Sequence, residues 1–260
     1  MRIQASVYII CLNEEANIAR VLNSVRDFDE VILVDSGSTD KTLEIAAGFD
    51  NVSISHQDWL GYAKQKQHAK NLCKHQWVLS LDSDQVCSAE LKELIQTYLG
   101  DASGVDALDI PIVEQHGLLK KKPRWRRPNT SIRFYKKELG NYNEVSVHES
   151  VRVEGRVKRV KASILHFGHD NLADQFAKID KYSTLRAQDK FNKGKKPSIV
   201  KLVFVFPLML FKNMFLKRGI INGFDGFVSS MNQAFYAYLK EVKLFVLWYG
   251  DHDDEPVDKE

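Results

Sequence analysis

Two aspartates one residue apart, Asp82 and Asp84, are the residues of this chain whose types and spacing point most clearly to chemistry. They follow an apolar run of strand length, Trp77 to Leu81, so they stand where a strand ends at the rim of a sheet. The two carboxylates lean to one side of an extended chain and can share a divalent cation if the chain bends. The alternative is a polar strand end before a helix that Ser88 caps and that covers residues 89–99.

Polar residues also end the two strands expected upstream. A β-prone apolar run over residues 5–12 ends at Asn13 and Glu14, and a second run over residues 30–34 ends at Asp35 and Ser36. Asn13 can also cap the helix that follows it. Ligands of an open α/β sheet bind beyond the carboxyl ends of its strands. These strand ends therefore predict one polar crevice that also includes the two aspartates.

The elements that position these residues alternate between strand and helix. A third strand is expected near residues 51–55, with helices from about residue 18, over 42–47 and over 59–74. This alternation predicts an α/β fold with right-handed crossovers and a mostly parallel, Rossmann-like central sheet flanked by helices. No G-x-G-x-x-G follows the first strand, and no G-x-x-x-x-G-K-[ST] occurs. A bound diphosphate would then be held chiefly by a metal.

Composition limits the kind of protein that can carry this crevice. At 260 residues, with 44% hydrophobic residues, the chain can bury a full core. Its three cysteines, Cys11, Cys73 and Cys87, form no even framework and no metal-ligand spacing, which indicates buried thiols in a reducing compartment. The N-terminal residues lack the pattern of a signal peptide, so an intracellular protein is expected.

Charge is unevenly distributed around a net value of +3. The last ten residues, 251–260, carry six acids and one lysine, and this acidic tail is expected to be disordered. Residues 116–161 contain fourteen Lys or Arg against four Asp or Glu. Such a stretch is either a solvated face or a site for substrate phosphates, a membrane surface or a nucleic acid.

Three segments carry a resemblance to a known family. Residues 7–15, 31–42 and 79–84, in this order and spacing, resemble the signatures of family-2 glycosyltransferases of the GT-A fold, over about the first 100 residues. Later segments, 147–149, 165–167 and 178–183, together with the apolar C-terminal region, resemble the bacterial lipopolysaccharide-core branch of β-1,4-glucosyltransferases.

The resemblance implies a GT-A domain over residues 1–168, with a donor half over about 1–100 and an acceptor half over about 101–168. It implies a hexosyltransferase that moves one sugar, expected to be glucose, from a UDP-sugar to a lipopolysaccharide core or another lipid-anchored glycan, with inversion and with Mg²⁺ or Mn²⁺. The alternatives are a polyprenyl phosphate or peptide acceptor, or a catalytically silent binding module. A nucleotidyltransferase is disfavoured, because Asn13 and Glu14 stand where its glycine-rich loop would be.

The resemblance also implies roles for individual residues. The donor site would contain Asn13, Glu14, Asp35, Ser36, Lys66 and Asp82. Within it, Asp35 would accept from the uracil N3 and Asp82 would contact the ribose or the sugar. Asp84, with Asp82, would ligate the metal that bridges the diphosphate, since hard carboxylate oxygens suit these ions. His166 is a further candidate ligand, with a core histidine as the alternative.

Transfer to an alcohol also requires a base on the face of the sugar opposite the leaving group. Glu149 is the expected base, and His148 would orient it or bind the acceptor; the alternative is a Glu149 that pairs with Arg152 or Arg133. An acceptor with carboxylates and phosphates would be held by arginine forks and a stacking indole. The residues expected to do so are Arg124, Trp125, Arg126 and Arg127.

A helical extension is expected over residues 169–250, with helices at 172–188 and 227–249. Between them, the uncharged run 202–211 is too short to span a bilayer and contains Pro207. It is expected to lie in the interface with flanking lysines facing anionic lipid, and a core or dimer-interface helix is the alternative. The expected location is the inner face of the cytoplasmic membrane. No nucleic-acid partner is expected, and the oligomeric state is left open.

Overall fold

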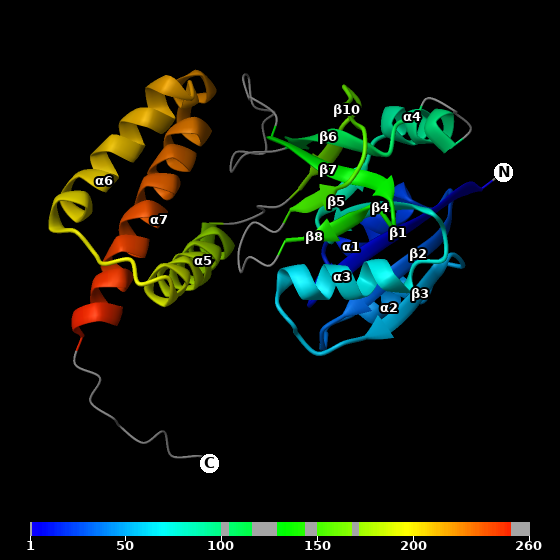
Figure 1. The fold of residues 1–260 in the computed structure, drawn as a ribbon, viewed down its shortest axis with the longest axis horizontal. Coiled ribbons are helices and arrows are strands. Elements are labelled where there is room, and N and C mark those ends of the chain that lie inside the picture. Colours follow the sequence, from blue (N-terminus) through cyan, green and yellow to red (C-terminus); the bar gives the residue numbers. More distant parts are fainter. Residues whose placement is uncertain (1, 100–103, 116–128, 144–149, 168–171, 251–260) are drawn as a thin grey trace, which may run out of the picture. The chain divides into compact units, whose positions relative to one another are not determined.

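The computed structural model describes residues 2–99, 104–115, 129–143, 150–167 and 172–250 (Figure 1). The chain divides into two units, residues 1–170 and residues 171–260. The first unit is built on a large mixed sheet, and the second consists of helices.

The first half of the sheet is parallel, as the strand–helix alternation predicts. Its strands are β1 (Ile3–Cys11), β2 (Phe28–Asp35), β3 (Val52–His56) and β4 (Trp77–Asp82), in the order β3-β2-β1-β4. The registers pair Cys11 with Asp35, Asp35 with His56, and Ile10 with Asp82. The connections after these four strands therefore leave from one edge of the sheet.

The later strands make the sheet mixed, which the local pattern does not indicate. Next to β4, β7 (Asn129–Lys136) runs antiparallel, and β6 (Ala107–Glu114) runs antiparallel to β7. β11 (Ile164–His166) and β10 (Val157–Arg159) both pair with β6 in parallel, and β5 (Gln85–Cys87) pairs antiparallel with β11. A separate two-stranded sheet contains β8 (Gly140–Tyr142) and β9 (Val151–Val153).

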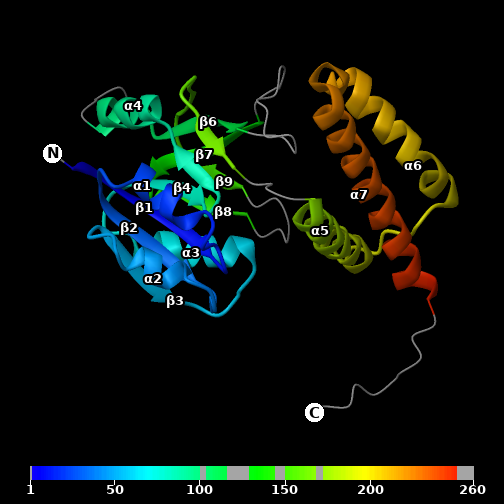
Figure 2. The same cartoon turned by 180° about the vertical axis from the view of Figure 1, so that it is seen from behind.

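Helices cover both faces of the parallel strands, so β1, β2 and β4 are buried along most of their length. In β1, Val7 and Ile9 point to one face, where they join the core formed with α1 (Ile18–Ser24), α2 (Thr42–Ala46) and α4 (Ala89–Leu99). Tyr8 and Ile10 point to the other face, where α3 (Tyr62–Leu72) packs. Figures 1 and 2 show the two faces in turn.

The second unit contains α5 (Leu172–Asn192), α6 (Ile199–Phe211), a π-helical turn η1 (Lys212–Leu216), a 3-10 turn η2 (Gly219–Asn222) and α7 (Gly223–Tyr249). α7 packs against both α5 and α6. Because η1 continues α6, the helical stretch Ile199–Leu216 is long and apolar enough to cross a membrane, judged by length and composition alone, and 6% of it is buried. The apolar segment is thus longer than the ten-residue run suggests.

Candidate active site

Asp82 is the last residue of β4, and its carboxylate lies between two cations. Lys66 Nζ, from α3, is 2.6 Å from Oδ1, and Arg133 Nη2, from β7, is 3.0 Å from Oδ2. Gln85 Nε2 also donates to Oδ2, at 2.6 Å. Three elements therefore fix this carboxylate, and 31% of its side chain remains exposed at the carboxyl edge of the sheet.

The two cations set the charge of Asp82. Burial raises the pKa of this carboxyl, but Arg133 and Lys66 outweigh burial and hold the pKa well below its usual range. In turn, Asp82 raises the pKa of the Arg133 guanidinium, although burial acts in the opposite direction. The result is an ionised Asp82 held in one orientation.

Asp84 faces a different partner. Its Oδ2 is 3.0 Å from His166 Nε2, and His166 Nδ1 is 2.8 Å from Glu114 Oε1. His166 reaches this position because β11 lies between β6, which carries Glu114, and β5. The structure thus separates the two aspartates: Asp82 is bound to cations, and Asp84 lies against an imidazole.

Asp84 offers carboxylate oxygens, which suit Mg²⁺ or Mn²⁺, and His166 offers a ring nitrogen, which Mn²⁺ accepts more readily than Mg²⁺. Glu114 contacts the opposite ring nitrogen, which is where a carboxylate fixes the orientation of a metal-binding histidine. Across the described ranges, no group of three or more His, Cys, Asp or Glu side chains is arranged to hold a metal. An ion here would take its remaining ligands from phosphate oxygens and water.

Asp35 is buried at the end of β2, and groups of the loop that follows β2 donate hydrogen bonds to its carboxylate. The backbone N–H groups of Gly37 and Ser38 donate to Oδ2 at 2.8 and 2.9 Å. Burial raises the pKa of Asp35, but these bonds and the Ser38 hydroxyl lower it overall. Gly37 has a φ of +101°, a backbone conformation that L side chains rarely adopt. Asp35 therefore shapes the loop that borders the crevice.

The loops after β1 and β2 are joined by hydrogen bonds. Asn13 Oδ1 accepts from Thr39 N at 2.8 Å, and Glu14 N donates to Thr42 Oγ1 at 2.7 Å. The prediction that Asn13 caps a helix is wrong. α1 begins at Ile18 with Asn17 at the N-cap position and no side-chain cap, and the Asn13 amide bonds to the loop after β2. The donor-site candidates Asn13 and Glu14 thus lie in a loop that hydrogen bonds fix to the loop after β2.

Gln65, on α3, links the loops after β2 and β3 to the rest of the site. Its buried side chain donates to Ser36 Oγ at 3.1 Å and to the Gln57 carbonyl at 2.9 Å. Gln65 precedes Lys66, so α3 fixes the loop after β2 and the cation at Asp82 together.

A buried tyrosine cluster anchors β8 beside β4. The Tyr8 hydroxyl lies 2.6 Å from the hydroxyls of Tyr135 and Tyr142, and Tyr142 is 3.0 Å from Ser80 Oγ. Asn143 Oδ1 accepts from Ser150 N at 2.8 Å, which closes the base of the β8–β9 connection. The described residues that flank positions 144–149 are therefore held close to the strand that ends at Asp82.

Several predicted site residues lie outside the described residues. They are His148, Glu149, Arg124, Trp125, Arg126 and Arg127. Arg133, one of two arginines considered as a partner of Glu149, is bound by Asp82. Sequence reasoning gave no role at this site to Arg133, Gln85 or Glu114. Arg133 and Glu114 join the site through strand pairing, and Gln85 joins it through the turn after β4. No local motif marks them.

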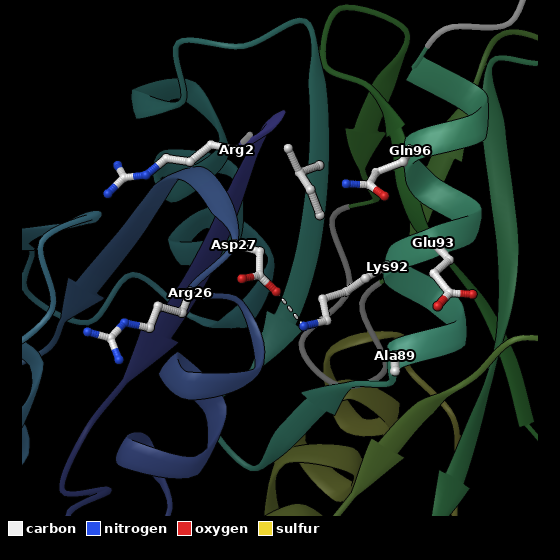
Figure 3. Close-up of a pocket in the computed structure, with 8 residues that line it drawn as sticks. Arg2, Arg26, Asp27, Ala89, Lys92, Glu93 and Gln96 are labelled. Carbon is white, nitrogen blue, oxygen red and sulfur yellow. Dashed lines mark hydrogen bonds and ion pairs between the residues drawn. The ribbon is translucent and has the colours of Figure 1, made fainter.

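A hollow of about 560 Å³ lies elsewhere on the first unit (Figure 3). It is lined by the start of β1, the segment before β2 and one side of α4, and Lys92 pairs with Asp27 there at 2.6 Å. These residues belong to the amino ends of the strands. The hollow is thus separate from the site at the carboxyl edge.

The fold of the first unit is that of the GT-A class. The structure of Staphylococcus aureus TarS 1–349 in complex with UDP-GlcNAc is similar, with a TM-score of 0.52 and 16% identity over 95% of this chain and 90% of that chain. The profile of glycosyl transferase family 2 matches residues 6–154. The chain belongs to glycosyl transferase family 2, and it is a glycosyltransferase.

Relatives match almost the whole chain. The lipopolysaccharide core biosynthesis glycosyltransferase LpsC of Rhizobium meliloti (strain 1021) is 31% identical over 94% of this chain and 93% of its own length. An uncharacterized glycosyltransferase of Rickettsia bellii (strain RML369-C) is 34% identical over 92% of this chain and 85% of its own. The similarity therefore extends through the helical unit.

Proposed function

We propose that this chain transfers one sugar, expected to be glucose, from a UDP-sugar to a lipopolysaccharide core or another lipid-anchored glycan, with inversion of configuration. The observation that carries the proposal is the arrangement of two aspartates at the end of β4. Asp82 contacts the cations Lys66 and Arg133, and Asp84 contacts the imidazole of His166. A diphosphate sugar needs both cationic and metal-binding groups at one place. The similarity to LpsC supports the acceptor class.

The proposed cofactor is Mg²⁺ or Mn²⁺, held by Asp84 and His166 with Asp82 beside them. When bound, such an ion neutralises charge that develops on the departing diphosphate. Lys66 and Arg133 keep Asp82 ionised and fix its orientation. The carboxylate would accept hydrogen bonds from ribose or sugar hydroxyls of the donor. The loops at Asn13, Glu14, Asp35 and Ser36 would form the rigid wall against the nucleoside.

For the acceptor, the proposed base is Glu149, with His148 beside it. A carboxylate on the far face of the sugar would take the proton of the attacking hydroxyl, which gives inversion. Arg124, Trp125, Arg126 and Arg127 are the proposed acceptor contacts, through charge-assisted hydrogen bonds and stacking. The proposed location is the inner face of the cytoplasmic membrane, where a lipid-anchored acceptor is accessible from the cytoplasm.

The experiment is a panel of UDP-sugars against the purified chain, followed by thermal shift and by UDP release, with and without Mn²⁺. One UDP-sugar should stabilise the protein in a metal-dependent manner. Asp84→Ala should lose this stabilisation and reduce UDP release by more than about 100-fold, because a direct ligand matters at least as much as the groups that orient it. Asp58→Ala, at an exposed aspartate, is the matched control and should behave as wild type.

A wild-type chain that responds to no UDP-sugar would overturn the proposal of a UDP-linked donor. An Asp84→Ala variant with unchanged metal dependence would overturn the assignment of the metal ligand.

A further inference from the structure

α6 and η1 expose a continuous apolar stripe. Val200, Phe204, Leu208, Phe211 and Phe215 recur every three or four residues, and their exposed fractions lie between 53% and 68%. No residue of α6 is buried. A helix that only completes a core would bury one face, so the exposure of this stripe needs another explanation.

The stripe continues around the turn into α7. Ile220 on η2 and Phe224 and Phe227 at the start of α7 are exposed as well. We call these eight side chains the apolar band. Two glycines allow close packing at the turn: a Cβ added at Gly226 would clash with the Gly219 carbonyl oxygen, and one added at Gly219 would lie 2.7 Å from Ser230 Oγ. The band therefore sits on a turn with little room to rearrange.

The other end of α7 does not belong to this band. Phe235 and Trp248 contact Phe176 and Phe191 of α5 through their rings. Asn232 donates to Gln175 of the same helix at 2.7 Å. These contacts hold this part of α7 against α5 within the helical unit.

Charge along residues 199–231 favours an anionic partner. The segment holds Lys201, Lys212, Lys217 and Arg218 against the single acid Asp225. All four cations are exposed: Lys201 lies near the start of α6, Lys212 lies where η1 begins, and Lys217 and Arg218 follow η1. Apolar side chains separate them. This is the arrangement of helices that lie in a membrane interface, where apolar side chains enter the acyl region and lysines reach phosphates.

The spacing of the charges argues against a span. Between Lys201 and Lys212 lie ten uncharged residues, about 15 Å of helix against about 30 Å of hydrocarbon. Lys201 Nζ also lies 3.3 Å from Glu241 Oε1, and Lys190 lies 2.6 Å from the same oxygen. A spanning α6 would carry this cluster toward the hydrocarbon together with the charged helix α5.

We propose that the apolar band lies in the plane of one leaflet of an anionic lipid bilayer, with the exposed cations Lys212, Lys217 and Arg218 on lipid phosphates. This inference deepens the proposed function, on which it rests for the presence of the acceptor at a membrane. The partner is the bilayer surface itself, recognised by apolar burial and by phosphate charge.

The first test is flotation of the full-length chain with vesicles of phosphatidylethanolamine and phosphatidylglycerol, and with neutral phosphatidylcholine vesicles. The wild type should bind the anionic vesicles. Phe211→Ser with Phe215→Ser, a pair of rings 5.0 Å apart, should lower the vesicle partition coefficient by about tenfold or more. Phe176→Ser with Phe235→Ser, a ring pair outside the band, is the matched control and should retain binding.

Circular dichroism checks that each variant is folded, and UDP release is measured in parallel. Normal UDP release without vesicle binding by the wild type would overturn this inference and leave the proposed function intact. Vesicle binding without UDP release would overturn the proposed function and leave this inference intact. A dimer in solution that Phe211→Ser with Phe215→Ser dissociates, with no vesicle binding by the wild type, would show that a second copy covers the band.

The second test distinguishes an in-plane helix from a span. Cysteines introduced as Lys196→Cys and as Lys217→Cys flank the helical stretch, and the native Cys11, Cys73 and Cys87 are buried. A membrane-impermeant maleimide added outside the vesicles should label both new cysteines without detergent. Protection of one of them until detergent is added would show a spanning helix and overturn the in-plane arrangement.

Discussion

The orientation of Asp82 depends on two cations from different elements, Lys66 on α3 and Arg133 on β7. A carboxylate that two cations hold stays ionised far into the acid range. Its contribution to stability is present above the pKa of the unfolded chain. That contribution is lost only as the pH falls through the lowered pKa of the folded state.

Arg133→Gln should therefore change both stability and its pH dependence. With one cation removed and burial unchanged, the pKa of Asp82 rises, so the variant loses stability at a higher pH than the wild type does. At neutral pH the free energy of unfolding should fall by about 1–3 kcal/mol. Urea unfolding at a series of pH values measures both effects.

Arg159→Gln, at an exposed arginine paired with Asp109, is the control and should cost about 1 kcal/mol or less. Equal pH profiles for the wild type and Arg133→Gln would contradict the role given to Arg133.

Glu114 acts on the proposed metal site through His166, since its Oε1 lies 2.8 Å from Nδ1. Glu114→Gln should weaken Mn²⁺ binding by about 10–100-fold, because the ring loses the carboxylate that orients it. Titration calorimetry with Mn²⁺ measures the effect without turnover. Glu154→Gln removes an exposed carboxylate and should leave the Mn²⁺ affinity unchanged. If both variants bind Mn²⁺ as tightly as the wild type, Glu114 does not position His166.

At the scale of elements, the three long helices of the second unit meet at Glu241. Its side chain is 2% exposed and accepts from Lys190 at 2.6 Å, with Lys201 at 3.3 Å and Lys240 at 3.6 Å. Burial raises the pKa of Glu241, but the lysines, Lys190 first, lower it overall. The carboxylate is thus the common partner of charges from α5, α6 and α7.

Glu241→Gln should destabilise this unit by about 1–3 kcal/mol, because partly buried lysines lose their counter-charge. In the wild type the stabilisation is present above the ordinary pKa of a glutamate and is lost as the pH falls through the lowered value, and the variant should lack this acid-induced loss. Far-ultraviolet circular dichroism during unfolding follows the helices. Asp180→Asn, at an exposed partner of Lys243, should change stability by about 1 kcal/mol or less. A wild-type acid transition in Glu241→Gln would exclude Glu241 as its source.

At the scale of the whole molecule, residues 1–250 carry a charge of +8, because the acidic segment 251–260 accounts for the difference from the net +3. This excess of positive charge favours an anionic surface, and its effect is screened within about 10 Å at an ionic strength of 0.1 M. Raising the salt concentration should therefore weaken binding to anionic vesicles. UDP-sugar affinity should change far less, since Lys66 and Arg133 of the proposed donor site are largely shielded from solvent.

Flotation and calorimetry over the same salt series compare the two effects. Vesicle binding that is insensitive to salt would show that apolar contact alone accounts for docking.

The sequence by itself determined the parallel half of the sheet and the place of the polar strand ends. Apolar runs and helical spacing are local properties, so they predict that strands end at Asp35 and Asp82 and that helices lie between them. The capping of α4 by Ser88 is equally local, and Ser88 Oγ accepts from Leu91 N at 3.2 Å. The sequence pattern predicted too short an apolar helix, because Lys212 interrupts the apolar run without ending the helix.

Only the tertiary structure decided which groups surround the two aspartates. Arg133 is 51 residues from Asp82, and His166 is 82 residues from Asp84. These pairs meet because β7 lies beside β4 and because β11 inserts between β6 and β5. Strand order depends on the packing of the complete sheet, which no local pattern of residues expresses. For the same reason Asn13 binds the neighbouring loop, where spacing along the chain had suggested a helix cap.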